Sequence, residues 1–194
     1  DKSGRVVGLK VKGKDGTYTI HSKALVDAAG GFGANNEMVA KYVPRLKGFA
    51  TTNHPGATGD GLLLAEKIGA QLIQMDQIQT HPTVVPNVGE MITEAVRGNG
   101  AVLINKEGKR FYNELETRDK VSAAILKQKD GVAYLFFDSD MQKSLKATNN
   151  YIKQKYCLNG ATLDEVAGKM GVPADTLKAT MDAWKAVSYT HLRA

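Results

Sequence analysis

Residues 92–118 read ITEAVRGNGAVLINKEGKRFYNELETR. An apolar run at 101–104 precedes Lys106-Glu107-Gly108, and a second short run follows at 110–113. This order predicts a β-hairpin. Charged side chains surround the hairpin, at Glu94, Arg97, Arg110, Glu114, Glu116 and Arg118. A solvated surface would explain these charges, and so would an active site that binds carboxylates and moves protons.

Upstream of this stretch, the pattern indicates strands and then a short helix. Residues 7–11 and 18–20 alternate on either side of the Asp15-Gly16 turn, which predicts two strands. An apolar run at 23–28 ends in GGFG, as a strand does where its backbone approaches a ligand closely. Plain turns use glycine in the same way. Residues 36–42 predict a helix that stops before Pro44.

A second helix is predicted after GATGDG, because Leu64, Ala65 and Ile68 share one face. Gly59 and Asp60 would lie at its N-terminus, where free N–H groups and the helix dipole can bind an anion. Asp60 could instead cap the helix without any ligand. The following residues, 71–85, look extended.

Downstream of the hairpin, helices and strands alternate. Periodicity predicts a helix at 119–129, a buried strand at 133–137, a helix from Ser139 to about 156, and a last helix at 173–186. Ser139 is expected to cap its helix, and Thr162 with Glu165 matches a capping box. We therefore expect a mixed α/β chain with a boundary near Asp76.

Composition limits the function classes. The chain has 194 residues, 42% hydrophobic and 24% charged, which suits one folded domain or two small ones. No apolar run is long enough to cross a bilayer, so we expect no membrane insertion. The net charge of +6 comes from Lys and Arg scattered among Asp and Glu, so nucleic-acid binding ranks last. Cys157 is the single cysteine, which excludes an internal disulfide and a Cys-based metal site; we expect no metal.

The two ends of the sequence are unusual. The last segment, VSYTHLRA at 187–194, resembles the translation of a transposon adapter used in sequencing libraries, so we expect it to be an artefact. An ordinary frayed terminus is the alternative. The chain opens on Asp1 and reads as a piece of a longer protein, so missing targeting signals say little about compartment.

Four motifs occur in one order along the chain: TNHPGATGDG at 52–61, QTHPT at 79–83, ITEAVRG at 92–98 and NELETRD at 113–119. In this order and spacing they resemble the flavoprotein family of fumarate reductases and succinate dehydrogenases, above all its soluble flavocytochrome c type. The resemblance covers residues 1 to about 186. It implies non-covalent FAD in a Rossmann-like domain, with a smaller α+β capping, or clamp, domain closing over it.

The resemblance also divides the chain. Residues 1–75 would be the C-terminal part of the FAD-binding Rossmann-like segment, and 76–186 would be most of the capping domain. The GxGxxG pyrophosphate fingerprint would lie upstream, and a further substrate-binding His and Arg downstream. Electrons would come from a haem or FMN domain, or from a partner protein, absent here. The resemblance favours the periplasm and leaves the cytoplasm open.

By resemblance, Arg118 is the proton donor, and Glu94 and Arg97 relay protons to it. Their i, i+3 spacing would place Glu94 and Arg97 side by side on a helix. Arginine is a surprising acid because its ordinary pKa is above about 12, so the carbon that it protonates must be strongly basic. Without the other motifs, Glu94 and Arg97 would be interpreted as a surface ion pair.

The same resemblance places His81, Thr93 and Glu94 at the substrate carboxylate. It assigns the FAD contacts to Ala29, Gly30, Gly59 and Asp60. A structural histidine and a helix cap are the plainer interpretations of His81 and Thr93. Arg110 and Glu114 are expected to brace the hairpin.

The expected function is FAD-dependent reduction of the C=C bond of fumarate to succinate. Another 2-enoate, such as urocanate, is the alternative substrate. A second hypothesis is that the chain is not an enzyme but an incomplete fragment that cannot bind FAD alone. We expect little or no turnover from the 194-residue chain by itself, and flavin absorbance after purification separates these hypotheses.

Overall fold

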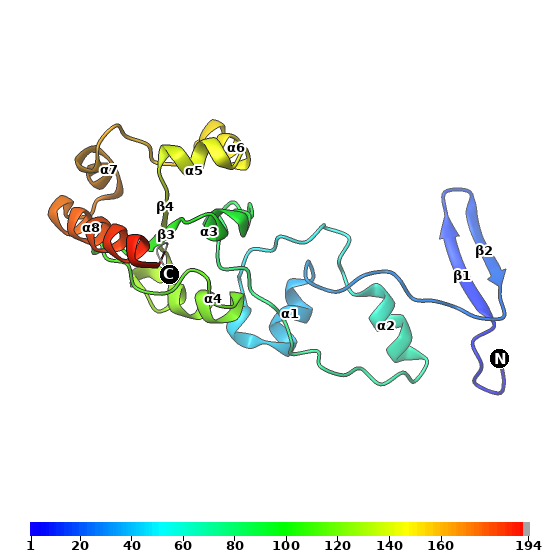
Figure 1. Cartoon of the computed structure of the whole chain (residues 1–194). Helices are drawn as coiled ribbons and strands as arrows, with labels where there is room; N and C mark the ends of the chain where they lie inside the picture. The colour runs from blue at the N-terminus through cyan, green and yellow to red at the C-terminus, as the bar shows by residue number, and fades with distance from the viewer. Residues whose placement is uncertain (192–194) are drawn as a thin grey trace. The chain divides into compact units, whose positions relative to one another are not determined.

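The computed structural model describes the backbone of residues 1–191 and the side chains of residues 1–186 (Figure 1). The chain divides into two compact units, Asp1–Ile78 and Gln79–Ala194, close to the expected boundary. That these units are an FAD-domain segment and a capping domain stays a prediction. The side chains of the proposed adapter tail, 187–194, lie outside the described residues.

Unit 1 contains a two-stranded sheet and short helices. Its elements are β1 (Gly8–Gly13), β2 (Gly16–His21), α1 (Asn36–Tyr42), the 3-10 turn η1 (Pro44–Leu46) and α2 (Asp60–Lys67). The strands pair antiparallel across the predicted turn. The hairpin and both helices expected from periodicity are thus confirmed.

Two local predictions in unit 1 are wrong. The apolar run at 23–28 is irregular chain, and Val26 is 86% exposed. A strand needs a neighbouring strand to pair its backbone N–H and C=O groups. Among the described residues of unit 1, β1 and β2 pair only with each other, so residues 23–28 have no strand to pair with. Gly59, with φ +80°, occupies the N-cap position of α2, so Asp60 is the first helical residue and not the cap.

Unit 2 is built on a second antiparallel pair, β3 and β4. Its elements in chain order are α3 (Ala95–Gly98), β3 (Val102–Ile104), α4 (Arg118–Leu126), η2 (Lys129–Gly131), β4 (Tyr134–Phe136), α5 (Ser139–Ser144), α6 (Ala147–Lys153), α7 (Leu163–Met170) and α8 (Ala174–His191). The predicted helix after Arg118 and the predicted strand near 135 are therefore confirmed.

The predicted hairpin at 101–113 is present only in part. Ile104 and Arg110 form a single antiparallel bridge, and the Asn105 N–H donates to the Lys109 carbonyl at 2.9 Å. Gly108 makes the turn with φ +78°. The main partner of β3 is β4, because β4 brings apolar side chains to both faces of the pair.

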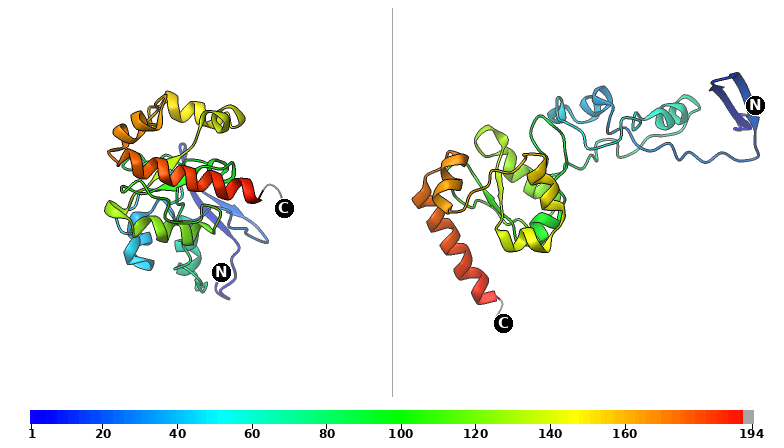
Figure 2. Two further views of the ribbon diagram at one scale, coloured as in Figure 1. Left: turned by 60° about the vertical axis from the view of Figure 1, so that its left-hand side comes forward. Right: turned by 90° about the horizontal axis from the view of Figure 1, so that it is seen from above.

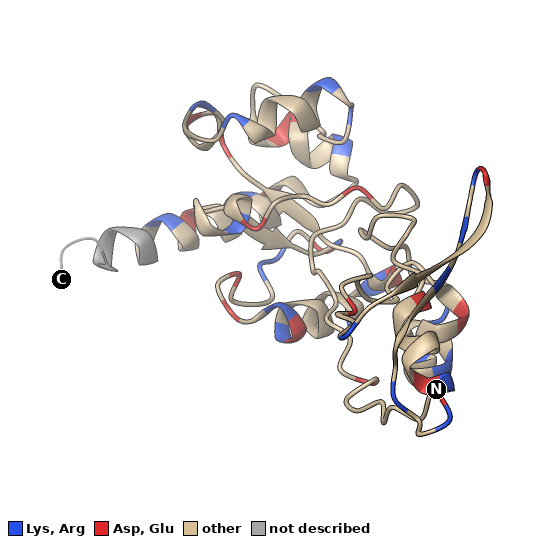
Figure 3. Cartoon of the chain, turned by 90° about the vertical axis from the view of Figure 1, so that its right-hand side faces the viewer, with Lys and Arg blue, Asp and Glu red and all other residues tan. Residues whose placement is uncertain are grey.

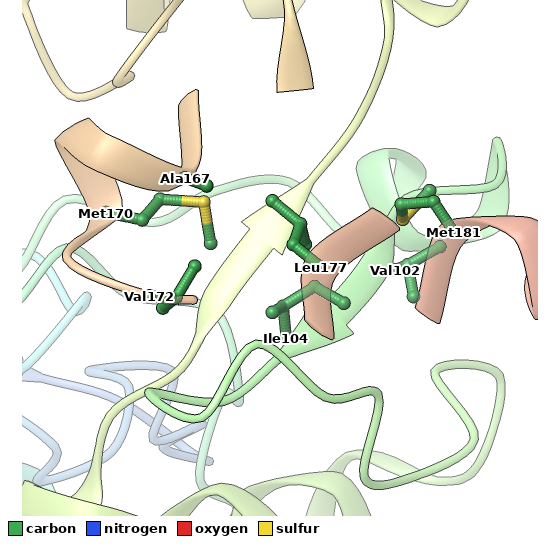
Figure 4. Close-up of a cluster of buried hydrophobic side chains, with 7 residues drawn as sticks. All are labelled: Val102, Ile104, Ala167, Met170, Val172, Leu177 and Met181. Atoms are coloured by element: carbon green, nitrogen blue, oxygen red, sulfur yellow. The ribbon is translucent and has the colours of Figure 1, made fainter. Parts of the chain in front are cut away.

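Strand β3 is buried on both faces and organises the core of unit 2. Val102 and Ile104 join a cluster with side chains of α7 and α8, which lie beside each other (Figures 2 and 4). Leu103 joins a different cluster, with Val121 and Ile125 of α4. Successive side chains of a strand point to opposite faces, so this short strand holds helices on both sides.

The helix predicted from Ser139 to about 156 is two helices, α5 and α6. The fully buried Thr148 lies at the break, and its hydroxyl donates to the Leu145 carbonyl at 2.7 Å. The same carbonyl also accepts from the Thr148 N–H at 3.0 Å, so the turn between the two helices is closed by two bonds to one acceptor.

Of the two N-cap residues predicted from the sequence, the one for α7 is confirmed and the one for α5 is wrong. Asp138, not Ser139, caps α5, because its carboxylate accepts from the Met141 N–H at 2.9 Å. Thr162 caps α7 as predicted, accepting from the Glu165 N–H at 3.2 Å.

Over the coloured part of the ribbon in Figure 3, Lys and Arg are interspersed with Asp and Glu, on helices and loops alike. Within the part of the chain that the structure describes, no helix is long and apolar enough to span a membrane.

Candidate active site

Glu94 is held between two arginines in unit 2. Its Oε1 accepts from Arg97 Nη2 at 2.8 Å, and its Oε2 accepts from Arg118 Nη2 at 2.6 Å and Nε at 3.1 Å. Glu94 occupies the N-cap position of α3, and Arg118 begins α4. The structure therefore brings together the three residues predicted to form a proton relay.

The two arginines differ in burial. Arg97 is 2% exposed, and its Nη1 donates to the main-chain carbonyl of Glu114 at 2.5 Å. The side chain of Arg118 is 38% exposed, and its Nη1 donates to Gln79 Oε1 at 2.8 Å. The triad of Arg97, Glu94 and Arg118 thus runs from the core to the surface. The surface-pair interpretation is wrong for Arg97.

Within the triad, Glu94 and Arg118 stabilise each other's charged form. Hydrogen bonds from Arg118, aided by the charges of both arginines, lower the pKa of Glu94 below its ordinary value. The hydrogen bond and charge of Glu94 in turn raise the pKa of Arg118. Glu94 is therefore an anion and Arg118 a firm cation near neutral pH, which suits Arg118 to attract a carboxylate.

The charges of the triad act on the pKa of His81. Burial, followed by the positive charge of Arg118, lowers the pKa of His81 below its ordinary value, which favours a neutral ring near pH 7. Its Nδ1 lies 3.2 Å from the Thr83 carbonyl and 3.3 Å from the Thr83 amide nitrogen, so the tautomer decides which bond forms. Both contacts use Nδ1, which leaves Nε2 as the nitrogen to meet a ligand.

Thr93 is half-buried, one residue before Glu94. Its N–H donates to the Tyr151 hydroxyl at 3.0 Å, and its carbonyl accepts from the Val96 N–H at 3.0 Å. The N-cap position of α3 belongs to Glu94, so the helix-cap interpretation of Thr93 is wrong.

Glu114 and Arg110 brace the hairpin as predicted. Arg110 donates to Glu114 through Nη2 at 2.8 Å and Nε at 3.0 Å, and the Leu103 N–H donates to Glu114 Oε1 at 2.9 Å. The guanidinium of Arg110 also lies 4.5 Å from the ring centre of Trp184. The unpredicted contact is the one from Arg97 to the Glu114 carbonyl, which ties this brace to the triad.

Sequence reasoning missed two other residues that touch the predicted site. Gln79 accepts from Arg118 and precedes His81 by two residues. In extended chain, side chains two residues apart point to the same side, so this spacing could have predicted that Gln79 and His81 lie on one side. Tyr151 reaches Thr93 across 58 residues of sequence, and no local pattern connects them.

The segments predicted to contact FAD meet within unit 1. The Gly59 N–H donates to the Gly31 carbonyl at 3.0 Å, which joins the GGFG loop to the start of α2. A Cβ at Gly59 would lie 2.8 Å from Phe32 Cβ, whereas Gly30, with φ +83°, has open space around it. The N–H of Ala29 is used by the Asp27 carboxylate at 3.0 Å.

These residues fit a dinucleotide. The first N–H groups of α2 have no intrahelical partner and can donate to phosphate, and the exposed Asp60 can accept from hydroxyl groups. Gly30 lets a ligand approach its backbone. Among the described residues, no group of three or more His, Cys, Asp or Glu side chains is arranged to hold a metal ion.

Comparisons with family models and with known proteins point to the same family. The model of the FAD binding domain family matches residues 1–189. A cytochrome-type fumarate reductase of Shewanella frigidimarina is 48% identical over 182 residues, which cover 93% of this chain and 32% of that protein. A urocanate reductase of Eggerthella lenta is 40% identical over 196 residues, which cover 95% of this chain and 32% of that protein.

A solved structure agrees. The open conformation of a flavocytochrome c3 fumarate reductase matches with a TM-score of 0.74 and 40% identity, over 98% of this chain and 34% of that one. The chain thus spans about a third of the length of these relatives. Its mixture of helices and small sheets is similar to part of that structure, and the chain belongs to the FAD-binding flavoprotein family that includes the fumarate reductases.

Proposed function

We propose that the protein containing this chain is an FAD-dependent reductase that converts fumarate to succinate. The observation that carries the proposal is the position of Glu94 between the buried Arg97 and the exposed Arg118. The terminal nitrogens of Arg97 contact the Glu114 carbonyl and Glu94, so the triad links the core to the exposed Arg118, as a proton path to a bound substrate requires.

In this proposal, Arg118 completes the reduction by protonation. When bound and reduced, FAD would supply the hydride that one alkene carbon receives. Arg118 gives a proton to the neighbouring carbon, whose new electron pair is basic enough to take it from a guanidinium. The Glu94 carboxylate then accepts a proton from Arg97 and passes it to Arg118, and Arg97 regains a proton from water, which closes the cycle.

The other predicted residues hold the reactants. His81 and Thr93 hydrogen-bond a substrate carboxylate, and Glu94 keeps Arg118 oriented toward the substrate. Such positioning can supply a large part of an enzyme's rate. Ala29, Gly30, Gly59 and Asp60 contact FAD from unit 1. We also propose that unit 2 is the capping domain, and that a haem or FMN domain or a partner protein supplies electrons.

Two variants of Arg118 test the proposal in the full-length, FAD-loaded protein. Fumarate reduction is measured with a reduced dye, and bound flavin by its absorbance. Arg118→Ala and Arg118→Lys should each lower kcat by about 10²-fold or more while flavin stays bound. Lys120→Ala is the control, since Lys120 lies in the same helix and forms an exposed pair with Glu116. Turnover retained in both Arg118 variants would exclude the donor role.

Urocanate is the second candidate substrate. The observation that favours it is the 40% identity to a urocanate reductase. Assaying fumarate, urocanate and other enoates side by side decides between them, because Arg118 would serve as donor in each case and only the carboxylate-binding partners would differ.

A further inference from the structure

One peptide group of the candidate site is held from both ends by side-chain hydroxyls. The Ile92 carbonyl accepts from Thr83 Oγ1 at 2.8 Å, and the N–H of the same peptide, on Thr93, donates to the Tyr151 hydroxyl at 3.0 Å. The Ile92 N–H also donates to the Thr83 carbonyl at 2.9 Å. This peptide therefore has little freedom to rotate.

Thr83 connects this peptide to His81. It is 7% exposed, and its carbonyl and amide nitrogen lie 3.2 and 3.3 Å from His81 Nδ1. A shift of Thr83 would therefore move His81 and the Ile92–Thr93 peptide together. His81 and Thr93, the two residues proposed to bind one substrate carboxylate, are thus both held by the buried Thr83.

Tyr151 holds the other end of the peptide, and its ring is itself packed against the core. Its ring, on α6, packs against a buried cluster that includes Val96 and Met141. Val96 belongs to α3, so the cluster against which Tyr151 packs includes a residue of the helix whose preceding turn the phenol bonds. Packing thus sets where the hydroxyl lies, and the hydroxyl sets where Thr93 lies.

No local cap holds this turn. The N-cap residue of α3 is Glu94, which makes no side-chain cap bond because its carboxylate is engaged by Arg97 and Arg118. A four-residue helix without a cap has little stability of its own. The turn that carries Thr93 and Glu94 depends on its tertiary hydrogen bonds.

We infer that Thr83 and Tyr151 act as positioning residues, which clamp the Ile92–Thr93 peptide so that His81 and Thr93 meet the same substrate carboxylate. This inference rests on the proposed function, in which Thr93 binds substrate. Neither hydroxyl touches the reacting atoms; each acts through the backbone that it holds.

The clamp is tested in the full-length, FAD-loaded protein with Tyr151→Phe and Thr83→Val, which delete one hydroxyl each and keep the shape of the side chain. Removing one neutral hydrogen bond should lower kcat/KM for fumarate about three- to tenfold, mainly through KM. Thr83→Ser keeps the hydroxyl and should restore most of the loss.

The chain offers matched controls. Tyr134 donates its hydroxyl to the Met170 carbonyl at 2.6 Å, and Thr180 donates to the Gly108 carbonyl at 2.8 Å, both within the α7–α8 side of unit 2. Tyr134→Phe and Thr180→Val should lower the melting temperature as much as the clamp variants do. They should leave KM unchanged, which separates positioning from general stability.

A double-mutant cycle completes the test. In a Thr93→Ala background, Tyr151→Phe should lower kcat/KM by less than it does in wild type, because the Thr93 hydroxyl that it positions is gone. Additive losses would overturn the clamp, as would a wild-type KM in both clamp variants when Thr93→Ala raises KM. In those cases the proposed function stands. A wild-type protein that reduces no enoate would overturn both.

Discussion

Glu94 has two carboxylate oxygens, and each is bonded to a different arginine. In the proposed relay, a proton from Arg97 arrives at Oε1 and Arg118 takes one from the side of Oε2. The carboxyl group must therefore accept a proton and turn, which only a titratable side chain can do. An amide of the same shape keeps the geometry and loses this capacity.

We expect Glu94→Gln to lower kcat for fumarate about 10²-fold, with a smaller change in KM, because reprotonation of Arg118 becomes slow. The measurement is steady-state reduction by the full-length, FAD-loaded protein. Glu116→Gln is the control, since Glu116 forms only an exposed pair with Lys120. Equal activity of Glu94→Gln and wild type would exclude a relay through this carboxylate.

The pKa of His81 makes stability depend on pH. Burial and the charge of Arg118 lower this pKa in the folded chain, so the unfolded chain binds the proton more readily. The contribution of neutral His81 to stability is full above its ordinary pKa of about 6.5 and is lost as pH falls through the folded pKa.

Urea unfolding from pH 7.5 down to pH 5 checks this, and His81→Gln should flatten the part of the decline that His81 causes. Titration of the ring by NMR gives the midpoint directly. A midpoint at or above 6.5 would contradict the expected direction.

Among the elements, β3 and the hairpin are bonded by the Glu114 carboxylate, and α3 is bonded by the Glu114 main-chain carbonyl. Glu114 is 2% exposed, accepts from the Leu103 N–H and from Arg110, and offers its own carbonyl to Arg97. The side chain of Arg110 is 33% exposed, so water can solvate its charge when Glu114 is removed, and most of the cost comes from the buried Leu103 N–H left without its acceptor.

We expect Glu114→Ala to lower the free energy of unfolding by about 1–3 kcal/mol, measured by denaturant unfolding. The exposed Glu116→Ala should cost about 0–1 kcal/mol, because surface pairs contribute little. Similar losses in the two variants would show that Glu114 is not the brace between these elements.

For the whole molecule, the two units differ in how much apolar surface they bury. The buried hydrophobic side chains of unit 1 are Met38, Val43 and Leu46, whereas three clusters fill unit 2. Large apolar side chains of unit 1 are exposed, Val26 at 86% and Ile73 at 67%. A unit with so small a core opens locally at low free-energy cost.

We therefore expect the 194-residue chain, expressed alone, to retain little FAD and to show little or no turnover. Limited proteolysis should cut first within residues 1–78 and leave a protected fragment of unit 2. Flavin absorbance and mass spectrometry of the fragments are the readouts. Stoichiometric flavin and even resistance of both units would contradict this expectation.

The sequence by itself determined the elements whose causes are local. The β1–β2 hairpin, α1, α2 and the Thr162 cap follow from alternation, i, i+4 spacing and capping chemistry within a few residues. The pairing of Glu94 with Arg97 belongs to the same class, because one helical turn brings them together. The order and spacing of the four motifs also indicated the family, since a motif is a property of the chain and not of its packing.

Only the tertiary structure decided the rest. The β4 partner of β3, the break before α6, the burial of Arg97, and the reach of Tyr151 to Thr93 all join residues that are distant in sequence or depend on what surrounds them. Such contacts form when apolar faces pack and buried polar groups must find partners, and no local pattern encodes which distant group is nearest.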